Sequence, residues 1–168
     1  MSLYGFATRV KTIYKRDFSE EEIKEKFWDP FFDAYPKVKK WRNKTVNSFA
    51  NGNRVAFTPH GRRRLNLETE RQALNTPIQA GALDVMKSIA VAIYERRSVA
   101  PGPVEIVGLV HDEILIVTSE KATEAVAGWV DAIMKEVGEE VANYGVDEDK
   151  KVPVEASTAV CATWAEKE

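Results

Sequence analysis

Two carboxylates stand next to each other between two apolar runs, in His111-Asp112-Glu113. The flanking residues, 104–110 and 114–118, are rich in β-branched side chains and are typical of buried strands. Adjacent carboxylates beside buried strands are costly unless a cation or solvent stabilises them. Magnesium, with its preference for oxygen ligands, would do so. We expect Asp112 to be the ligand and Glu113 to support it, because successive strand side chains point to opposite faces. A solvated acidic turn is the alternative.

Cationic residues are concentrated in the first part of the chain. Residues 1–100 carry 19 Lys and Arg against 11 Asp and Glu, whereas residues 101–168 carry 5 against 15. Such clusters bind nucleic acid by releasing its condensed counterions, but a charge run taken alone favours a solvated basic helix face slightly. Residues 34–67 contain no acidic residue and nine cations, namely Lys37, Lys39, Lys40, Arg42, Lys44, Arg54, Arg62, Arg63 and Arg64.

Composition excludes several other kinds of chemistry. Cys161 is the only cysteine and there are two histidines, so neither an internal disulfide nor a zinc site is expected. The 168 residues are 44% hydrophobic and 30% charged, which is enough for a globular domain. The sequence has no apolar run of about 18 residues and no signal-peptide pattern at its start. We therefore expect a cytoplasmic protein with no membrane contact.

The first half of the chain is predicted to be mainly helical. Ser19-Glu20-Glu21-Glu22 has the spacing of a capping box, which predicts that a helix begins there. A second helical period follows Pro36 and is ended by Asn51-Gly52. Four aromatic residues near helical spacing are expected in the core: Phe27, Phe31, Phe32 and Tyr35.

The middle of the chain is expected to present cations and then a long helix. Residues 54–58 are predicted to form a short strand, and residues 59–61 a turn that presents three arginines. Residues 68–97 have a helical pattern, and we expect a break at Pro77, where Thr76 would cap a new helix. One stripe of the second segment should be buried: Ile78, Ala82, Val85, Met86, Ile89, Ala90 and Ile93.

The last third is predicted to contain strands on both sides of a helix. Residues 104–118 read as an antiparallel hairpin with the charged tripeptide at its tip. Ser119 is expected to cap an amphipathic helix, and residues 152–160 to form a strand that pairs with the hairpin. The fold class is therefore α+β, and without repeats or flexible linkers residues 1–168 are expected to contain no domain boundary.

Several motifs, in a fixed order, resemble those of family A DNA polymerases, the DNA polymerase I-like family. Val110-His111-Asp112-Glu113 is similar to motif C of the family, and Tyr4-Gly5-Phe6 to the end of motif B. Thr58 with Gly61-Arg62-Arg63-Arg64 is similar to its Thr-x-x-Gly-Arg-Arg-Arg motif. Ordered motifs are far more specific than any one alone. The resemblance extends over the whole chain, through residues 31–38, Trp41, Glu70-Arg71, Asn75, Pro77, Gln79, Asp84, Met86-Lys87, residues 152–155 and Trp164.

The resemblance implies that residues 1–168 are one partial domain, a polymerase palm with the end of the fingers, whose antiparallel sheet packs against long helices. Asp112 would be catalytic and bind magnesium, with Glu113 beside it. Arg71, Asn75 and Gln79 would contact the minor groove of primer-template DNA, where all base pairs present similar acceptors. The alternatives are an ion pair with Glu68 or Glu70 for Arg71, and capping or solvation for the two amides.

The remaining residues implied by the resemblance also contact DNA. His111 would lie beside the primer terminus and Tyr4 near the templating base, although either can equally be a core residue. The arginine triplet, Arg62, Arg63 and Arg64, would hold phosphates, because guanidinium groups match phosphate oxygens and keep their charge.

The implied activity is DNA replication chemistry, the transfer of a nucleotide from a dNTP to a primer 3′ hydroxyl. It uses two Mg²⁺ ions held by two aspartates, one of which would be Asp112. The sequence contains no Asp-Tyr-Ser segment of motif A, nor the Arg and Lys of motif B. We therefore predict that this chain alone is inactive and that a second polypeptide carrying motifs A and B could complete it.

Some features of the sequence depart from the family pattern or favour other functions. The segment 64–71 is several residues shorter than is usual in the bacterial repair enzymes of the family, which favours a phage-like or divergent member, in a bacterium or a phage-infected cell. Ala80 replaces a glycine that approaches DNA in the family. Glu113 favours a DNA polymerase, because the related RNA polymerases typically have Ser there. A non-catalytic DNA-binding palm module and a split-polymerase subunit remain alternatives. A metal-dependent nuclease is disfavoured because no third acidic partner occurs in a motif.

Overall fold

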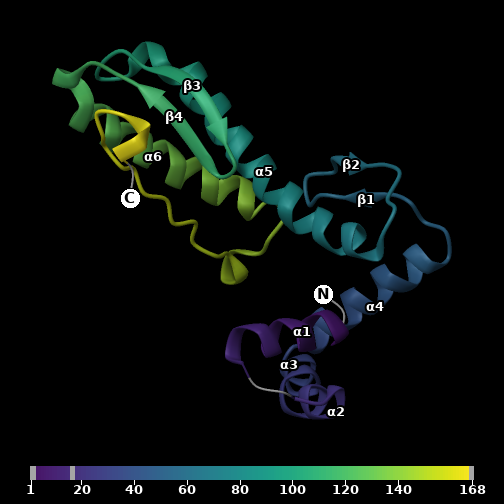
Figure 1. Ribbon diagram of the computed structural model, residues 1–168. Coiled ribbons are helices and arrows are strands. Elements are labelled where there is room, and N and C mark those ends of the chain that lie inside the picture. The colour runs from purple at the N-terminus through teal and green to yellow at the C-terminus, as the bar shows by residue number, and fades with distance from the viewer. Residues whose placement is uncertain (1–2, 16–17, 167–168) are drawn as a thin grey trace. The chain divides into compact units, whose positions relative to one another are not determined.

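The computed structural model describes residues 3–15 and 18–166. The chain divides into two compact units, Met1–Ala56 with Arg63–Thr76, and Phe57–Arg62 with Pro77–Glu168. Helices predominate, and two small two-stranded sheets accompany them (Figure 1). The α+β prediction is therefore confirmed.

The first unit begins with a set of short helices. They are α1 (Leu3–Tyr14), α2 (Glu20–Ile23), a π-helix (Lys24–Trp28) and α3 (Asp29–Ala34). The predicted capping box is present. The backbone N–H of Glu22 donates to Ser19 Oγ at 3.1 Å, and the Ser19 N–H donates to Glu22 Oε2 at 3.0 Å. These bonds satisfy two donors that a helix start would otherwise leave unpaired.

The aromatic residues of this unit are less buried than predicted. Phe32 is buried, with 7% of its surface exposed, but Phe27, Phe31 and Tyr35 are 42%, 50% and 55% exposed. The core prediction was therefore wrong for these three. They pack partly on other rings, and the Phe31 and Tyr35 centroids lie 5.1 Å apart.

Helix α4 (Pro36–Ala50) follows, and it ends before Asn51-Gly52 as predicted. Gly52 has φ +92°, in the left-handed region that glycine adopts readily. A small core in this unit consists of Leu67, Ala56 and Ala73, with Phe49 of α4 packed against it.

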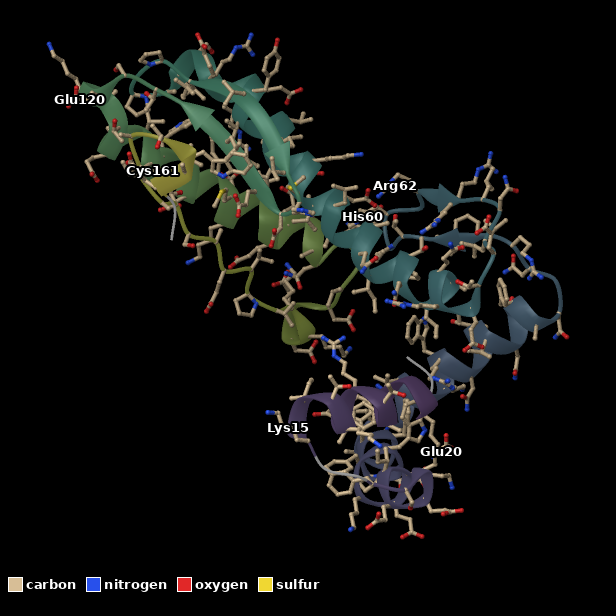
Figure 2. All side chains as sticks on the ribbon, in the orientation of Figure 1. Lys15, Glu20, His60, Arg62, Glu120 and Cys161 are labelled. Carbon is tan, nitrogen blue, oxygen red and sulfur yellow. The ribbon has the colours of Figure 1, made fainter. Side chains whose placement is uncertain are left out.

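The predicted strand at residues 54–58 is shorter in the structure. Strand β1 (Ala56–Phe57) pairs with β2 (Arg63–Arg64), and the turn at Pro59-His60 lies between them as predicted. Figure 2 shows the side chains of His60 and Arg62 in this connection.

Helix α5 (Glu70–Arg96) runs through Pro77 without a break, so the prediction of two helices was wrong. Thr76 does not act as a cap, because its Oγ1 donates to the Gln72 carbonyl at 2.7 Å within the helix. Proline removes one helical hydrogen bond, but favourable packing elsewhere in a long helix can outweigh that cost. The predicted stripe is buried at Ile89, Ala90 and Ile93, whereas Ile78 is 64% exposed.

The predicted hairpin is present in the second unit. Strands β3 (Glu105–Val110) and β4 (Glu113–Val117) are antiparallel, and Val110 pairs with Glu113 across a two-residue turn. Helix α6 (Thr123–Ala142) follows a 3-10 turn (Glu120–Ala122). Ser119 provides no side-chain cap, contrary to prediction; its carbonyl instead accepts a bond from Thr123 Oγ1.

The main core of the second unit lies between α5, α6 and the inner face of the hairpin. Ile93 is fully buried and packs with Ile89 of the same helix, and with Val126, Val130, Ile133 and Val137 of α6. Ile106, Ile114 and Ile116 of the hairpin pack against this cluster. The hairpin is therefore held on its inner face while its tip stays open to solvent.

The predicted strand at residues 152–160 is not formed, so that prediction was wrong. The side chain of Asn143, which is 6% exposed, bonds both backbone groups of Val152, at 2.8 and 2.9 Å. Pro153 has no N–H to donate to a strand ladder. The backbone here is therefore anchored by a side chain instead of a sheet, and the segment continues to the exposed Cys161 (Figure 2).

None of the helices in the described ranges is long and apolar enough to span a membrane.

Candidate functional site

The turn between β3 and β4 presents the acidic residues. His111 and Asp112 form the turn and are exposed, and Glu113, the first residue of β4, is half-buried. His111 has φ +55°, in the left-handed region that tight hairpin turns often require. The structure thus places the Asp112 carboxylate at the accessible tip of a hairpin whose inner face is anchored in the core.

The donor set at this tip fits a magnesium site that is completed by other groups. Mg²⁺ is usually held by one or two carboxylates together with water and substrate phosphates. Asp112 provides one exposed carboxylate, and the neighbouring Glu113 provides a second. Within residues 3–15 and 18–166, no three acidic, His or Cys side chains gather into a metal-binding group. The exposed carboxylate of Asp112 fits such a site, which further groups would have to complete.

The loop that carries the first arginine is tightly closed. The Thr58 N–H donates to the Arg62 carbonyl at 2.8 Å, and the Arg62 N–H donates to Thr58 Oγ1 at 3.2 Å. Gly61 has φ +82°, and a Cβ built at Gly81 would lie 3.2 Å from Pro59 Cδ. Two glycines thus allow the turn to close and α5 to approach it.

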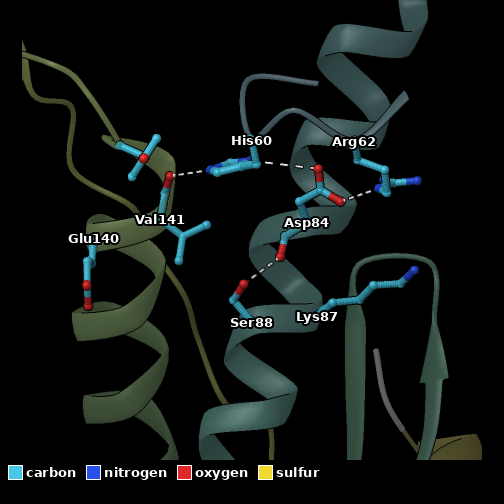
Figure 3. A pocket seen from close by; sticks show the side chains of 8 residues that line it. His60, Arg62, Asp84, Lys87, Ser88, Glu140 and Val141 are labelled. Atoms are coloured by element: carbon cyan, nitrogen blue, oxygen red, sulfur yellow. Dashed lines mark hydrogen bonds and ion pairs between the residues drawn. The ribbon is translucent and has the colours of Figure 1, made fainter. Parts of the chain in front are cut away.

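The side chain of Arg62 contacts α5. Its Nε donates to Asp84 Oδ1 at 2.6 Å, and its Nη2 donates to the Ala80 carbonyl at 2.8 Å. Figure 3 shows the two side chains pointing toward each other. Two donor nitrogens of Arg62 therefore hold the loop against the helix. No local pattern in the sequence predicts this contact.

His60 makes a second connection from the same loop. Its Nε2 donates to the carbonyl of Val141, in the last turn of α6, at 2.7 Å, and its Nδ1 lies 3.7 Å from Asp84 Oδ2 (Figure 3). Together with Lys87, Ser88, Glu140 and Tyr144, these groups line an open cavity of about 390 Å³.

Asp84 is the electrostatic centre of this cluster, and its side chain is 13% exposed. Burial raises the pKa of Asp84, but hydrogen bonds with Thr58 and Arg62, and the charges of Arg62 and His60, outweigh burial and lower that pKa below its ordinary value. Asp84 therefore stays ionised and holds the loop. One feature of the sequence could have indicated this contact: Asp84 stands next to the apolar stripe of a helix. A carboxylate in such a place needs a cation to stabilise it.

The remaining residues predicted to contact DNA lie on strand β2 and on helix α5. Arg63 and Arg64 are exposed on β2. On α5, Arg71 is exposed and Asn75 is half-buried one turn later, both in the first unit, whereas Gln79 is exposed in the second unit. Residues four apart lie on one side of a helix, so Arg71 and Asn75 share a face.

Tyr4 lies in the first turn of α1, but its side chain is outside the described part of the structure.

The fold and the acidic hairpin tip can be compared with known proteins. The model of DNA polymerase family A matches residues 1–166. The chain therefore belongs to this family.

Three relatives show the range of similarity. DNA polymerase I of Caldicellulosiruptor bescii is 35% identical over 69% of this chain and 14% of the relative. The thermostable DNA polymerase I of Thermus filiformis is 31% identical over 98% of this chain and 19% of its own length. DNA polymerase I of Aquifex aeolicus is 27% identical over 98% of this chain and 27% of its own.

A solved structure has the same fold. The POL domain of Pol1 from M. smegmatis, in complex with a DNA primer-template and dNTP, matches with a TM-score of 0.64 and 27% identity. The match covers 83% of this chain and 24% of that chain. The chain thus spans about a quarter or less of the length of these relatives.

Proposed function

We propose that this chain takes part in template-directed DNA synthesis, as the palm and the end of the fingers of a family A DNA polymerase. The reaction would transfer a nucleotide from a dNTP to a primer 3′ hydroxyl. Membership of the family supports the proposal, as does the likeness to a polymerase domain bound to DNA primer-template and dNTP. The observation that carries it is the exposed Asp112 at the tip of a hairpin anchored in the core.

Asp112 would hold a divalent cation, and Glu113 would support it. Bound Mg²⁺ supplies stabilisation of negative charge on the attacking and leaving oxygens of phosphoryl transfer. The role of the chain is positional. The hairpin core keeps the Asp112 carboxylate at a fixed point beside the exposed His111, which would contact the primer terminus.

Several exposed side chains would contact DNA. Arg71, Asn75 and Gln79 would donate to acceptors of the minor groove, which are similar in all base pairs and so allow sequence-independent contact. Arg63 and Arg64 would bind phosphates through exposed guanidinium groups.

Two further residues have more particular roles in this proposal. Arg62 would act partly through Asp84, because two of its nitrogens already donate to α5. Tyr4 would lie near the templating base.

In this proposal the second metal-binding aspartate would belong to a motif A segment of the Asp-Tyr-Ser type, which these 168 residues do not contain. Such residues could belong to a longer form of the same polypeptide or to a second polypeptide. We expect no primer extension by the 168 residues alone, and recovery of extension when a polypeptide with motifs A and B is added. Extension by the pure chain would contradict this part of the proposal.

The decisive variant is Asp112→Asn, tested in the reconstituted or longer enzyme. Metal-bound charge stabilisation contributes several kcal/mol, so we expect primer extension to fall by about 10³-fold or more. Affinity for primer-template DNA should change little, and it is measured in parallel by fluorescence anisotropy. The matched control is Asp131→Asn in the middle of α6, outside the hairpin turn; asparagine can still accept the hydrogen bond from Thr158, so this variant should keep full activity.

The alternative function is a non-catalytic DNA-binding module. In that case Asp112→Asn would leave the biological activity intact, and no added polypeptide would restore synthesis. If Asp112→Asn kept its DNA synthesis, in the reconstituted enzyme or in the longer one, the catalytic role of this carboxylate would be refuted.

A further inference from the structure

The five cations of helix α4 fall into two groups, those with an interaction partner and those without an ion pair in the described residues. Two of them have partners within the first unit: Lys39 Nζ lies 3.3 Å from Asp33 Oδ1, and the Arg42 guanidinium lies over the rings of Trp28 and Phe32, at 5.4 and 6.0 Å. The other three, Lys37, Lys40 and Lys44, follow a spacing of three and four residues. That spacing places them on one face of the helix.

The lysine face, defined by Lys37, Lys40 and Lys44, carries unneutralised charge. All three side chains are exposed, and in the described part of the chain none of them makes an ion pair. Residues 34–67 contain no Asp or Glu that could neutralise them. The helix itself has no fully buried residue. Three exposed cations without an ion-pair partner among the described residues make this face positively charged and accessible to an anionic ligand.

Trp41 lies on the same face, next to Lys40 and one turn from Lys37 and Lys44. Trp41 is 38% exposed, so part of its indole is open to solvent. A solvent-exposed indole flanked by lysines offers a stacking surface between cations. Duplex DNA and acidic peptides would use the charge but leave the indole without a partner, whereas unpaired bases stack on aromatic rings.

The dimensions of the lysine face suit a short stretch of single strand. Lys37 and Lys44 are separated by about 10 Å along the helix axis, at 1.5 Å per residue. A stacked strand carries one phosphate per about 3.4 Å, so this length corresponds to about three phosphates. Three cations and one ring can therefore hold three phosphates and one base.

We propose that the lysine face of α4, together with Trp41, is a binding site for single-stranded DNA. The proposal extends the proposed function, because it adds a site for unpaired strand to the hairpin, the arginines and α5. Its occupant is recognised by phosphate charge and base stacking, without regard to sequence.

The test measures binding of a fluorescein-labelled oligothymidylate of about 12 nucleotides, within the site sizes of single-strand binding domains. The variant Lys37→Gln/Lys40→Gln/Lys44→Gln should bind about 100-fold more weakly at 0.1 M salt. The slope of log K against log salt should become less steep by about 2, because each lost phosphate contact contributes about 0.7. Trp41→Leu should weaken binding about tenfold and leave the slope unchanged.

The matched control removes three lysines that have partners in the same unit. Lys24, Lys26 and Lys39 lie within 3.3 Å of Asp29, Glu22 and Asp33. The variant Lys24→Gln/Lys26→Gln/Lys39→Gln changes the net charge by the same amount as the lysine-face variant. Because its three lysines are already paired with carboxylates, it should keep most of the affinity for the oligothymidylate. Circular dichroism of every variant checks that the helices are retained.

Several results would overturn the proposal. Equal loss of affinity in the two triple variants would show a general charge effect, and unchanged binding by Trp41→Leu would remove the stacking role. If duplex DNA or polyglutamate displaced the labelled oligothymidylate as well as unlabelled single strand does, the face would bind polyanions in general and the assignment to single-stranded DNA would be wrong.

The experiments distinguish failure of the lysine-face site from failure of the proposed function. If Arg63→Gln/Arg64→Gln weakens primer-template binding while the α4 variant keeps oligothymidylate affinity, the lysine face is refuted and the proposed function stands. If the unaltered chain binds neither DNA, both fail.

Discussion

The arrangement around Asp84 combines a buried carboxylate with two basic side chains from one loop. Arg62 and His60 approach opposite oxygens of Asp84, and His60 also reaches the end of α6. Hydrogen bonds to a charged group contribute more than neutral ones, and a buried charge that loses its partner is costly. Asp84 therefore fixes the conformation of the turn that precedes Arg63 and Arg64.

Asp84→Asn is expected to lower the free energy of unfolding by about 1.5–3 kcal/mol at pH 7. Because the pKa of Asp84 is lowered in the folded state, its contribution is fully present above the ordinary pKa of about 4. The contribution is lost as the pH falls through the folded-state value. Urea unfolding between pH 7 and pH 3 should show the difference between the two proteins shrinking below pH 4.

Glu136→Gln is the control for this effect. Glu136 pairs with Arg96 on the surface, which also lowers its pKa, but both side chains are well exposed. Exposed pairs contribute little, so this variant should be less destabilised than Asp84→Asn. A larger loss in Glu136→Gln would contradict the central role of Asp84.

At the scale of elements, two glycines near the hairpin and within α6 differ in how closely other atoms approach them. A Cβ on Gly102 would lie 2.4 Å from Ala122 Cβ, whereas a Cβ on Gly128 of α6 would meet nothing within 4 Å. The two positions thus differ in whether the surrounding structure must shift to accept a methyl group.

The same substitution at these two positions should have opposite effects. Gly102→Ala is expected to destabilise by about 1–3 kcal/mol through overpacking. Gly128→Ala should stabilise by about 1 kcal/mol, because alanine has the better helix propensity. Thermal unfolding of both variants measures the signs, and a stabilised Gly102→Ala would show that the segment before β3 is not packed as described.

At the scale of the whole chain, two cores lie in two units. Leu67 is 2% exposed in the core of the first unit, and Ile93 is 0% exposed in that of the second. Because the contacts of each core lie within its own unit, local stability is expected to differ between the units.

Leu67→Ala and Ile93→Ala should each cost about 2–5 kcal/mol in their own unit. Hydrogen exchange followed by mass spectrometry should show lower protection of α4 in Leu67→Ala and of α6 in Ile93→Ala. Uniform loss of protection over the chain in either variant would mean that the chain unfolds as one cooperative body.

The sequence alone predicted the features that depend on neighbours along the chain. The capping box at Ser19, the end of α4 at Asn51-Gly52 and the β3–β4 hairpin follow from local hydrogen bonds, turn conformations and side-chain periodicity. The family was predicted from ordered motifs in the same way, and the match over residues 1–166 confirmed it. The roles of Asp112 and the DNA-contacting residues stay predictions.

Tertiary structure decided what depends on residues far apart. Arg62 and Asp84 are 22 positions apart, and His60 and Val141 are 81, so no local pattern could pair them. Pro77 stayed within one helix, and Asn143 held Val152 outside any sheet, against local expectation. In each case the free energy of packing and of long-range hydrogen bonds outweighs local preferences of the backbone, which amount to a few kcal/mol at most.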